Sequence, residues 1–209
     1  MQKKAYLCLL NKTMDMPTDK SFIPLRGNYR ALIVYQKAEC IYDVTYYFAH
    51  KYLEKGDRTI DQMVQAARSG KQNIAEGSAA STTSRETELK LINVAKASLQ
   101  ELLIDYEDYL RVRELEQWQP NDARYQQTRA VLAKHNDSAY YREAIKIRSA
   151  ETIANIAITL IHQTDTMLVR LIEKLKQQFV EQGGIREEMS KARQNYKNNN
   201  KEENGGKNL

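Results

Sequence analysis

The side chains that most often carry out chemistry in proteins are few in this sequence and lie far apart. The three histidines are His50, His135 and His162, and none is paired with another His or Cys at metal-ligand spacing. Di-iron sites in helix bundles need Glu-x-x-His pairs, and the sequence contains none. We therefore expect no metal site, no cofactor and no catalytic residue.

Two further patterns have simpler explanations than catalysis. One is an acidic cluster made of Glu101, Asp105, Glu107 and Asp108. Without histidine partners it is more typical of a solvated helix face than of a di-metal centre. Gly70-Lys71 lacks the upstream glycine and the following Ser or Thr of a phosphate-binding loop. The sequence predicts a protein that is not an enzyme, and a site assembled between subunits is the catalytic alternative.

Positive charge is the other candidate source of function. The 209 residues include 32 Lys and Arg against 27 Asp and Glu, so the formal net charge is +5. This surplus permits an acidic partner such as RNA or DNA, although many globular proteins share it. The residues that we consider as phosphate contacts are Arg68, Lys71, Arg111, Arg113, Arg124, Arg129, Arg142 and Arg148.

The elements that must position these side chains are helices. Gly and Pro are scarce, and apolar residues recur at spacings of three and four in about 29–55, 57–76, 84–113 and 149–182. We expect an all-α fold: an antiparallel up-down four-helix bundle with a helical insertion between its third and fourth helices and a short C-terminal helix. The expected organisation is a flexible segment at 1–28, a bundle at 29–183 with the insertion at 111–148, and a C-terminal suffix at 184–209 that becomes disordered from Lys197.

Local signals set the expected ends of these helices. The candidate N-caps are Asp57 or Thr59, Thr83 or Ser84, and Asn121 or Asp122. The last pair starts a helix that reaches about Lys134 within the insertion. Gly77 is expected to end the second helix and Gly70 to kink it, and Gly183-Gly184 to stop the fourth.

The first helical segment is rich in tyrosine. Its tyrosines are Tyr29, Tyr35, Tyr42, Tyr46, Tyr47 and Tyr52. A tyrosine can bury its ring and leave its hydroxyl at a rim, or it can stack on a nucleic-acid base. Because these residues are scattered around the helix, we favour a bundle helix with an oligomer-facing side over a stacking surface.

Cysteine usage and hydropathy bear on localisation. Cys8 and Cys40 are isolated, which indicates a reducing compartment, and Cys40 lies in an apolar stripe where a small buried side chain fits. No apolar run approaches membrane-spanning length. We expect a cytoplasmic protein that does not enter a membrane.

One motif is more specific than these patterns. In the second helical segment, the matching residues are Gln62, Met63, Ala66, Ala67, Ser69, Asn73, Ile74, Ala75, Glu76 and Gly77. Further matches are Tyr35-Gln36-Lys37-Ala38 upstream and Glu88, Leu91, Ala95, Ser98, Leu99, Glu101 and Leu102 downstream. Over about 29–110 and 149–182 the chain resembles the bacterial four-helix-bundle family of the 23S rRNA intervening-sequence protein. The accessory variability determinant of diversity-generating retroelements belongs to the same family. The run from Phe179 to Glu187 resembles an extension that a subset of these bundles carries.

The resemblance implies a homopentamer that, in the retroelement members, binds nucleic acid and a reverse transcriptase. It also implies a structural role for Asn73, Ile74, Ala75, Glu76 and Gly77. Two adjacent arginines of the family pattern fall on Val64 and Gln65, which weakens a transferred nucleic-acid role because such side chains contact phosphates. Arg68 and Lys71 can replace them in part. The leading hypothesis is an oligomeric nucleic-acid adaptor, and the alternative is a protein-interaction scaffold.

Overall fold

The computed structural model describes residues 28–183 and 185–205, and every regular element in these ranges is a helix. The predicted all-α class is therefore confirmed for this part of the chain. The flexible segment expected at 1–28 lies outside the described residues except for Asn28, as do residues 206–209 of the expected tail. In chain order the elements are the 3₁₀ turn η1 (Tyr29–Ala31) and the helices α1 (Ile33–Tyr52), α2 (Arg58–Ala80), α3 (Arg85–Val112), α4 (Ala123–Lys134), α5 (Ser138–Ala144), α6 (Ala150–Gln182) and α7 (Ile185–Gly205).

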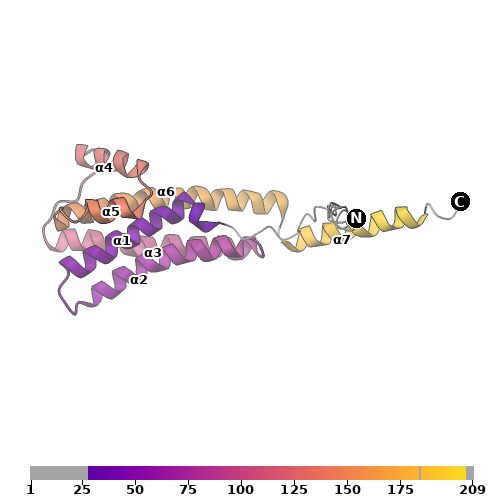
Figure 1. The fold of residues 1–209 in the computed structure, drawn as a ribbon, viewed down its shortest axis with the longest axis horizontal. Helices are drawn as coiled ribbons and strands as arrows, with labels where there is room; N and C mark the ends of the chain where they lie inside the picture. The colour runs from indigo at the N-terminus through magenta and orange to yellow at the C-terminus, as the bar shows by residue number, and fades with distance from the viewer. Residues whose placement is uncertain (1–27, 184, 206–209) are drawn as a thin grey trace, which may run out of the picture.

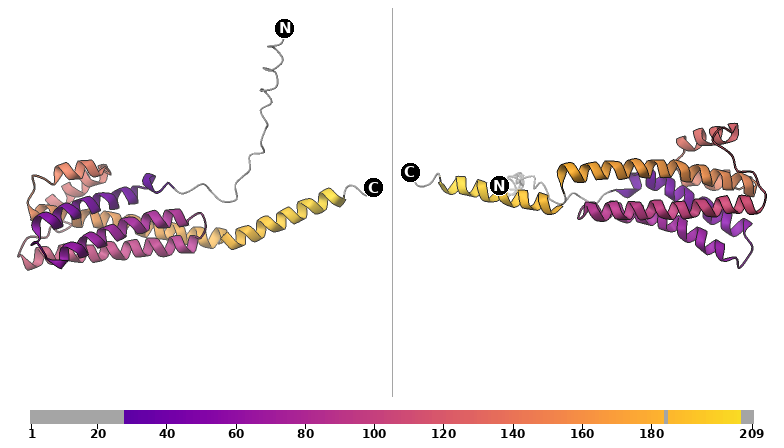
Figure 2. Two further views of the ribbon diagram at one scale, coloured as in Figure 1. Left: turned by 60° about the horizontal axis from the view of Figure 1, so that its bottom comes forward. Right: turned by 180° about the vertical axis from the view of Figure 1, so that it is seen from behind.

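The four longest helices of residues 28–183 pack side by side. Helix α2 packs on α1 and on α3, while α6 packs on α3 and on α1 (Figure 1). We call α1, α2, α3 and α6 the helical body. Helix α5 packs on α1 and α4 on α6, so the connection between α3 and α6 covers one end of this body (Figure 2). Helix α7 extends beyond the opposite end.

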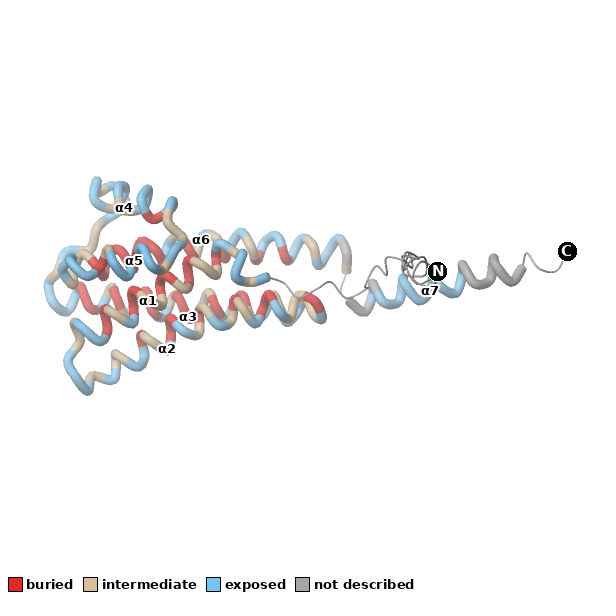
Figure 3. Tube along the Cα trace, in the orientation of Figure 1, coloured by how far each residue is buried: buried red, intermediate tan, exposed pale blue. Residues whose placement is uncertain are grey.

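The core forms where the apolar stripes of the four long helices meet, and Figure 3 shows that buried residues recur along each helix of the helical body. At one end of the core, the ring centroid of Phe48 lies 5.0 Å from that of Tyr106 and 4.7 Å from that of Tyr109. The buried Tyr106 hydroxyl donates a hydrogen bond to Thr45 Oγ1 at 3.0 Å, which avoids leaving a polar group without a partner in the core. Burial raises the pKa of Tyr106 well above its usual value.

The helix starts follow the predicted capping signals. The side chains of Asp57, Ser84 and Asp122 accept hydrogen bonds from backbone N–H groups two or three residues further on, at 2.8, 3.1 and 2.7 Å. These bonds satisfy N–H groups that have no partner within the helix. Among the alternatives that the sequence left open, the structure therefore selects Asp57, Ser84 and Asp122.

The predicted end of α2 at Gly77 is wrong. Helix α2 is a single helix that continues past Gly70, where the sequence predicts a kink, and past Gly77 to Ala80. Both glycines are buried against α3: a Cβ on Gly77 would lie 3.2 Å from Ile92 Cδ1, and one on Gly70 would lie 2.7 Å from Leu99 Cδ2. Their missing side chains allow close approach of α3.

Two further differences concern short and terminal elements. The sequence pattern indicates a break at His135–Ser138 within the helical insertion, and the structure adds a short helix that the sequence does not predict individually, α5 (Ser138–Ala144), which begins there with Asp137 as its N-cap. The suffix helix is longer than expected, because α7 extends to Gly205 and so includes much of the segment predicted to be disordered from Lys197. Once a helix has nucleated, each added residue gains one backbone hydrogen bond, and the Lys and Glu residues of this segment suit a helix although its asparagines do not.

Cys40 is fully buried in α1, as its apolar stripe predicted, and burial raises the pKa of its thiol from 9.0 to about 12. The stability that this shift contributes is complete below pH 9 and is lost as the pH rises toward 12, because the unfolded thiol ionises first.

In a Cys8→Ser variant, where Cys40 is the remaining thiol, we expect the folded protein to react with a disulfide reagent at pH 8 at least about 100-fold more slowly than the urea-unfolded protein. Similar rates in the two states would contradict the burial of Cys40.

No helix in the described part of the chain combines the length and the apolar character that a membrane span needs.

Candidate nucleic-acid interface

A row of aromatic rings runs along the outer face of α1. Tyr42, Tyr46 and His50 are spaced four residues apart, so their side chains follow one another along the helix. The ring centroids of Tyr42 and Tyr46 are 6.2 Å apart, and those of Tyr46 and His50 are 4.2 Å apart. Tyr46 is 49% exposed. Tyr46 and His50 are therefore exposed aromatic side chains, and Tyr42 is partly buried beside them.

This row forms one wall of an open groove of about 840 Å³ between α1 and α5. We call it the tyrosine groove, and it is lined by Tyr42, Asp43, Tyr46, Tyr47, His50, Lys51, Arg142, Ile145 and Lys146. Three cationic side chains therefore border the exposed rings. Aromatic rings next to cations are the combination that binds single-stranded nucleic acid, because bases stack on rings and phosphates pair with cations.

Two lysines are held against tyrosine rings at this surface. Lys51 Nζ lies 4.9 Å from the ring centroid of Tyr47 and donates a hydrogen bond to the Tyr47 hydroxyl at 2.5 Å. That hydrogen bond raises the pKa of Lys51. Lys71, on α2, lies 4.3 Å from the ring centroid of Tyr42. Cation–π contacts of this kind keep both ammonium groups beside the row of rings.

Of the predicted phosphate contacts, Arg142 lines the tyrosine groove, and Lys71 contacts the ring of Tyr42, one of the lining residues, from α2. Arg142 Nη1 donates to Asp43 Oδ2 at 2.8 Å, and the Arg142 side chain is 55% exposed. The Asp43 side chain is only 20% exposed, so a phosphate would have to compete with this carboxylate for the guanidinium.

The other predicted contacts are dispersed over the body. Arg111 forms an ion pair with Asp108 at 2.6 Å, and the Arg113 guanidinium carbon lies 4.0 Å from the ring centroid of Tyr109, both at the end of α3. Arg68 on α2 and Arg129 on α4 are exposed. Arg148 follows α5, and its Nε donates to the carbonyl of Ala144 at 3.1 Å. The described structure therefore does not gather these arginines into one basic surface.

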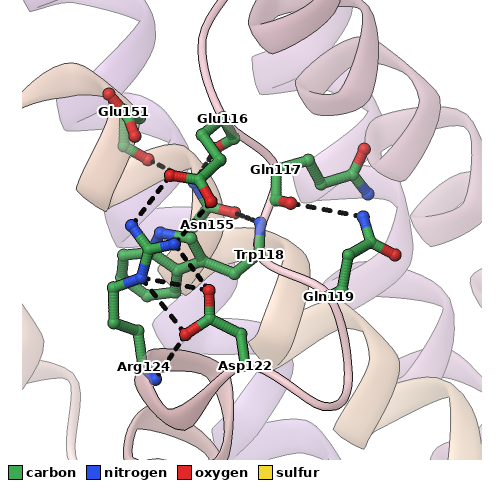
Figure 4. A network of polar contacts seen from close by, with 8 residues as sticks. All are labelled: Glu116, Gln117, Trp118, Gln119, Asp122, Arg124, Glu151 and Asn155. Atoms are coloured by element: carbon green, nitrogen blue, oxygen red, sulfur yellow. Dashed lines mark hydrogen bonds and ion pairs between the residues drawn. The ribbon is translucent and has the colours of Figure 1, made fainter.

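Arg124 is engaged within the protein (Figure 4). Its guanidinium donates to both carboxylate oxygens of Glu116, at 2.6 and 3.0 Å, and to those of Asp122, at 2.6 to 3.2 Å. Hydrogen bonds with Arg124 lower the pKa of both carboxyl groups and raise that of the guanidinium. A phosphate would have to displace two carboxylates, so Arg124 is a poor nucleic-acid contact.

The connection that carries this ion pair is held against α6 by Asn155, which is 1% exposed. The Asn155 side-chain amide donates to the carbonyl of Glu116 at 2.9 Å, and its oxygen accepts from the backbone N–H of Trp118 at 2.8 Å (Figure 4). A buried amide that is satisfied on both sides fixes the path of the loop. The same residue thereby positions Trp118 beside α4.

The Asn73–Gly77 motif lies along the contact between α2 and α3. Asn73 Nδ2 donates to the carbonyl and to the hydroxyl of Ser69, at 2.9 and 3.1 Å, and the Ser69 hydroxyl is 2.9 Å from that of Ser98. Ile74 and Gly77 are buried, Ala75 is partly buried and Glu76 is exposed. The motif contributes a polar contact and close packing between two helices.

The acidic cluster of α3 borders a groove between α2 and α3, where Glu101 and Asp105 lie near Asp61. Burial, with added repulsion from Asp108 and Glu101, raises the pKa of Asp105. Within residues 28–183 and 185–205, no group of three or more His, Cys, Asp or Glu side chains is arranged to hold a metal ion.

Taken together, the six tyrosines of the first helical segment are scattered around the helix, so the sequence predicts no stacking surface from them. The aromatic row differs from that expectation. In the structure Tyr42 and Tyr46 align with His50. The four-residue spacing is visible in the sequence once the histidine is counted with the tyrosines. What the spacing alone could not indicate is that α5 leaves this face open.

Comparison with protein-family models, with curated proteins and with solved structures finds no match for this chain. A function for this protein therefore has to be inferred from the geometry of its own residues.

Proposed function

We propose that this protein is a non-enzymatic, cytoplasmic adaptor that binds single-stranded RNA or DNA in the tyrosine groove. The observation that carries the proposal is the row Tyr42, Tyr46 and His50, bordered by cationic side chains. Bases would stack on the exposed rings, and Lys51, Arg142 and Lys71 would pair with phosphates. We further propose that the helical body is an antiparallel up-down four-helix bundle of the 23S rRNA intervening-sequence type and that the chain assembles as a homopentamer, as the sequence resemblance implies.

The first test is removal of one stacking ring. Tyr46→Ala is expected to weaken binding of a fluorescent single-stranded oligonucleotide by about 5- to 100-fold, because stacking on an aromatic ring contributes about 1–3 kcal/mol per base. Fluorescence anisotropy at fixed ionic strength measures the change. Tyr196→Ala is the matched control, since Tyr196 is 69% exposed on α7 and lies outside the groove. Equal affinities of the two variants would refute the assignment of the groove.

Salt dependence tests the phosphate contacts separately. The logarithm of the affinity should fall linearly with the logarithm of the salt concentration, and Lys51→Gln should reduce that slope by about 1. Lys174→Gln, an exposed change on α6, should leave the slope unchanged. Binding that does not respond to salt, or no binding at low salt, would exclude the nucleic-acid role.

A protein-interaction scaffold, with a partner such as a reverse transcriptase, is the alternative. Two observations favour it: Arg111 and Arg124 are already paired with carboxylates, and Ile104 and Val112 on α3 are 56% and 67% exposed. Light scattering coupled to size exclusion, with the nucleic-acid to protein absorbance ratio recorded on the same peak, separates the two functions. A pentamer that carries nucleic acid and releases it in high salt favours the adaptor, whereas a defined protein partner that survives nuclease treatment favours the scaffold.

A further inference from the structure

A second cavity, separate from the tyrosine groove, lies between α4, α5 and α6. Its volume is about 250 Å³. Three aromatic side chains, Trp118, Tyr140 and Tyr141, and the aliphatic side chains of Leu132 and Ile145 are among its walls. An apolar cavity of about 150 Å³ is enough to hold a benzene ring, so this one can take a single aromatic ring with a small substituent.

Besides Gln127 and Thr128, whose side chains can both donate and accept, two polar groups that remain available at this cavity can only donate. The indole Nε1 of Trp118 is buried and has no hydrogen-bond acceptor within the described residues. Arg148 also lines the cavity, and its hydrogen bond to Ala144 uses only Nε, which leaves both terminal nitrogens open among the described residues. Indole and guanidinium nitrogens can only donate hydrogen bonds. A molecule that satisfies both must therefore bring acceptors.

The nearby groups that could otherwise serve as partners are already engaged. The Arg124 guanidinium is held by Glu116 and Asp122, and the Tyr141 hydroxyl donates to the carbonyl of His135 at 2.8 Å. Tyr140 is fixed by stacking on His135, with ring centroids 3.8 Å apart and planes 2° apart. The Trp118 indole N–H and the terminal nitrogens of Arg148 therefore call for an acceptor beside the apolar wall of the cavity.

We propose that this cavity binds a small aromatic carboxylate, whose ring packs among Trp118, Tyr140 and Ile145 and whose carboxylate pairs with Arg148 and with the Trp118 indole N–H. A guanidinium and a carboxylate form strong charge-assisted hydrogen bonds, and the cavity walls exclude water from the ring. The assignment is independent of the nucleic-acid role, since no groove residue except Ile145 is shared.

The test uses the fact that the chain contains one tryptophan. The ¹H–¹⁵N spectrum of the full-length protein therefore has a single indole signal, that of Trp118, and sodium benzoate is the probe. We expect a saturable shift of this signal with benzoate, and binding at least about tenfold weaker for benzyl alcohol, which lacks the charge, and for acetate, which lacks the ring.

Two arginine variants complete the experiment. Arg148→Gln should weaken benzoate binding about tenfold or more, whereas Arg129→Gln removes the same charge from exposed α4 outside the cavity and should have no effect. Both positions are exposed, so both variants should fold, which circular dichroism checks. The proposal is overturned if benzoate gives no saturable shift, if benzyl alcohol or acetate binds as well as benzoate, or if Arg148→Gln leaves the affinity unchanged.

Discussion

Replacing Lys37 with alanine is expected to lower the free energy of unfolding by about 3–5 kcal/mol, through loss of buried volume and of two hydrogen bonds. Lys37 lies on α1 under the end of α4 and has no exposed surface. Its ammonium group donates to the carbonyl of His135 at 2.7 Å and to the carbonyl of Leu132. These carbonyls lie at the C-terminal end of α4, where helical partners are missing and the helix dipole favours a positive charge.

Leu132 is the one buried residue of α4 (Ala123–Lys134), so this helix has few other contacts with the core. Helix α4 therefore depends on the contact between Lys37 and its C-terminal carbonyls. Denaturation in urea, followed by circular dichroism and by the fluorescence of Trp118, measures the loss. Lys37→Met keeps most of the side-chain volume and should be milder, about 1–2 kcal/mol, because the Tyr141 hydroxyl still donates to the His135 carbonyl. Lys134→Ala, at an exposed position of the same helix, should change stability by less than about 0.5 kcal/mol. An equal effect of Lys37→Ala and Lys134→Ala would contradict the buried cap.

The same residue predicts a pH dependence. Burial lowers the pKa of Lys37 in the folded protein below its usual value of 10.5, which applies to the unfolded chain. At a pH between the folded-state pKa and the unfolded-state pKa, the unfolded chain binds a proton that the folded chain has released. The stability of the wild-type protein relative to Lys37→Met should therefore rise as the pH increases through this window, and it should level off above 10.5. Urea titrations of both proteins across this range measure the difference, and a fall in it would show that the ammonium is not desolvated.

The second large effect is expected at Gly70. In an exposed helix, replacing Gly with a larger residue stabilises the protein by up to about 1 kcal/mol. Here a Cβ would lie 2.7 and 2.8 Å from Leu99 Cδ2 and Cγ, and Leu99 is fully buried. Gly70→Val should therefore lower the free energy of unfolding by about 3 kcal/mol, because both helices must move apart or Leu99 must leave its rotamer. Thermal and urea unfolding give the value.

Two controls separate crowding from helix propensity. Ala79→Val introduces the same β-branched residue at an exposed position of α2 and should cost less than about 1 kcal/mol. Combining Gly70→Val with Leu99→Ala should be less destabilising than the sum of the single changes, since the second change makes room for the first. Additive effects of the two changes would mean that Gly70 and Leu99 are not in contact.

The sequence by itself determined the features that depend on nearby residues. The helical segments follow from apolar residues at spacings of three and four, and the caps Asp57, Ser84 and Asp122 follow because a capping side chain bonds to the backbone within three residues. The end of α6 at Gly183 also follows from a local signal, because the positive φ of 77° at this residue suits glycine.

The tertiary structure decided what depends on distant parts of the chain. Gly77 carries the same local signal as Gly183, yet α2 continues through it. At Gly77 the absence of a side chain leaves space for Ile92 of α3, a contact between two helices that the local signal does not show. The burial of Lys37 depends on the end of a helix that begins at Ala123. The candidate site divides in the same way: the four-residue spacing of Tyr42, Tyr46 and His50 is written in the sequence, but the groove beside them exists because α5 packs on α1, a contact between segments about a hundred residues apart that no local pattern encodes.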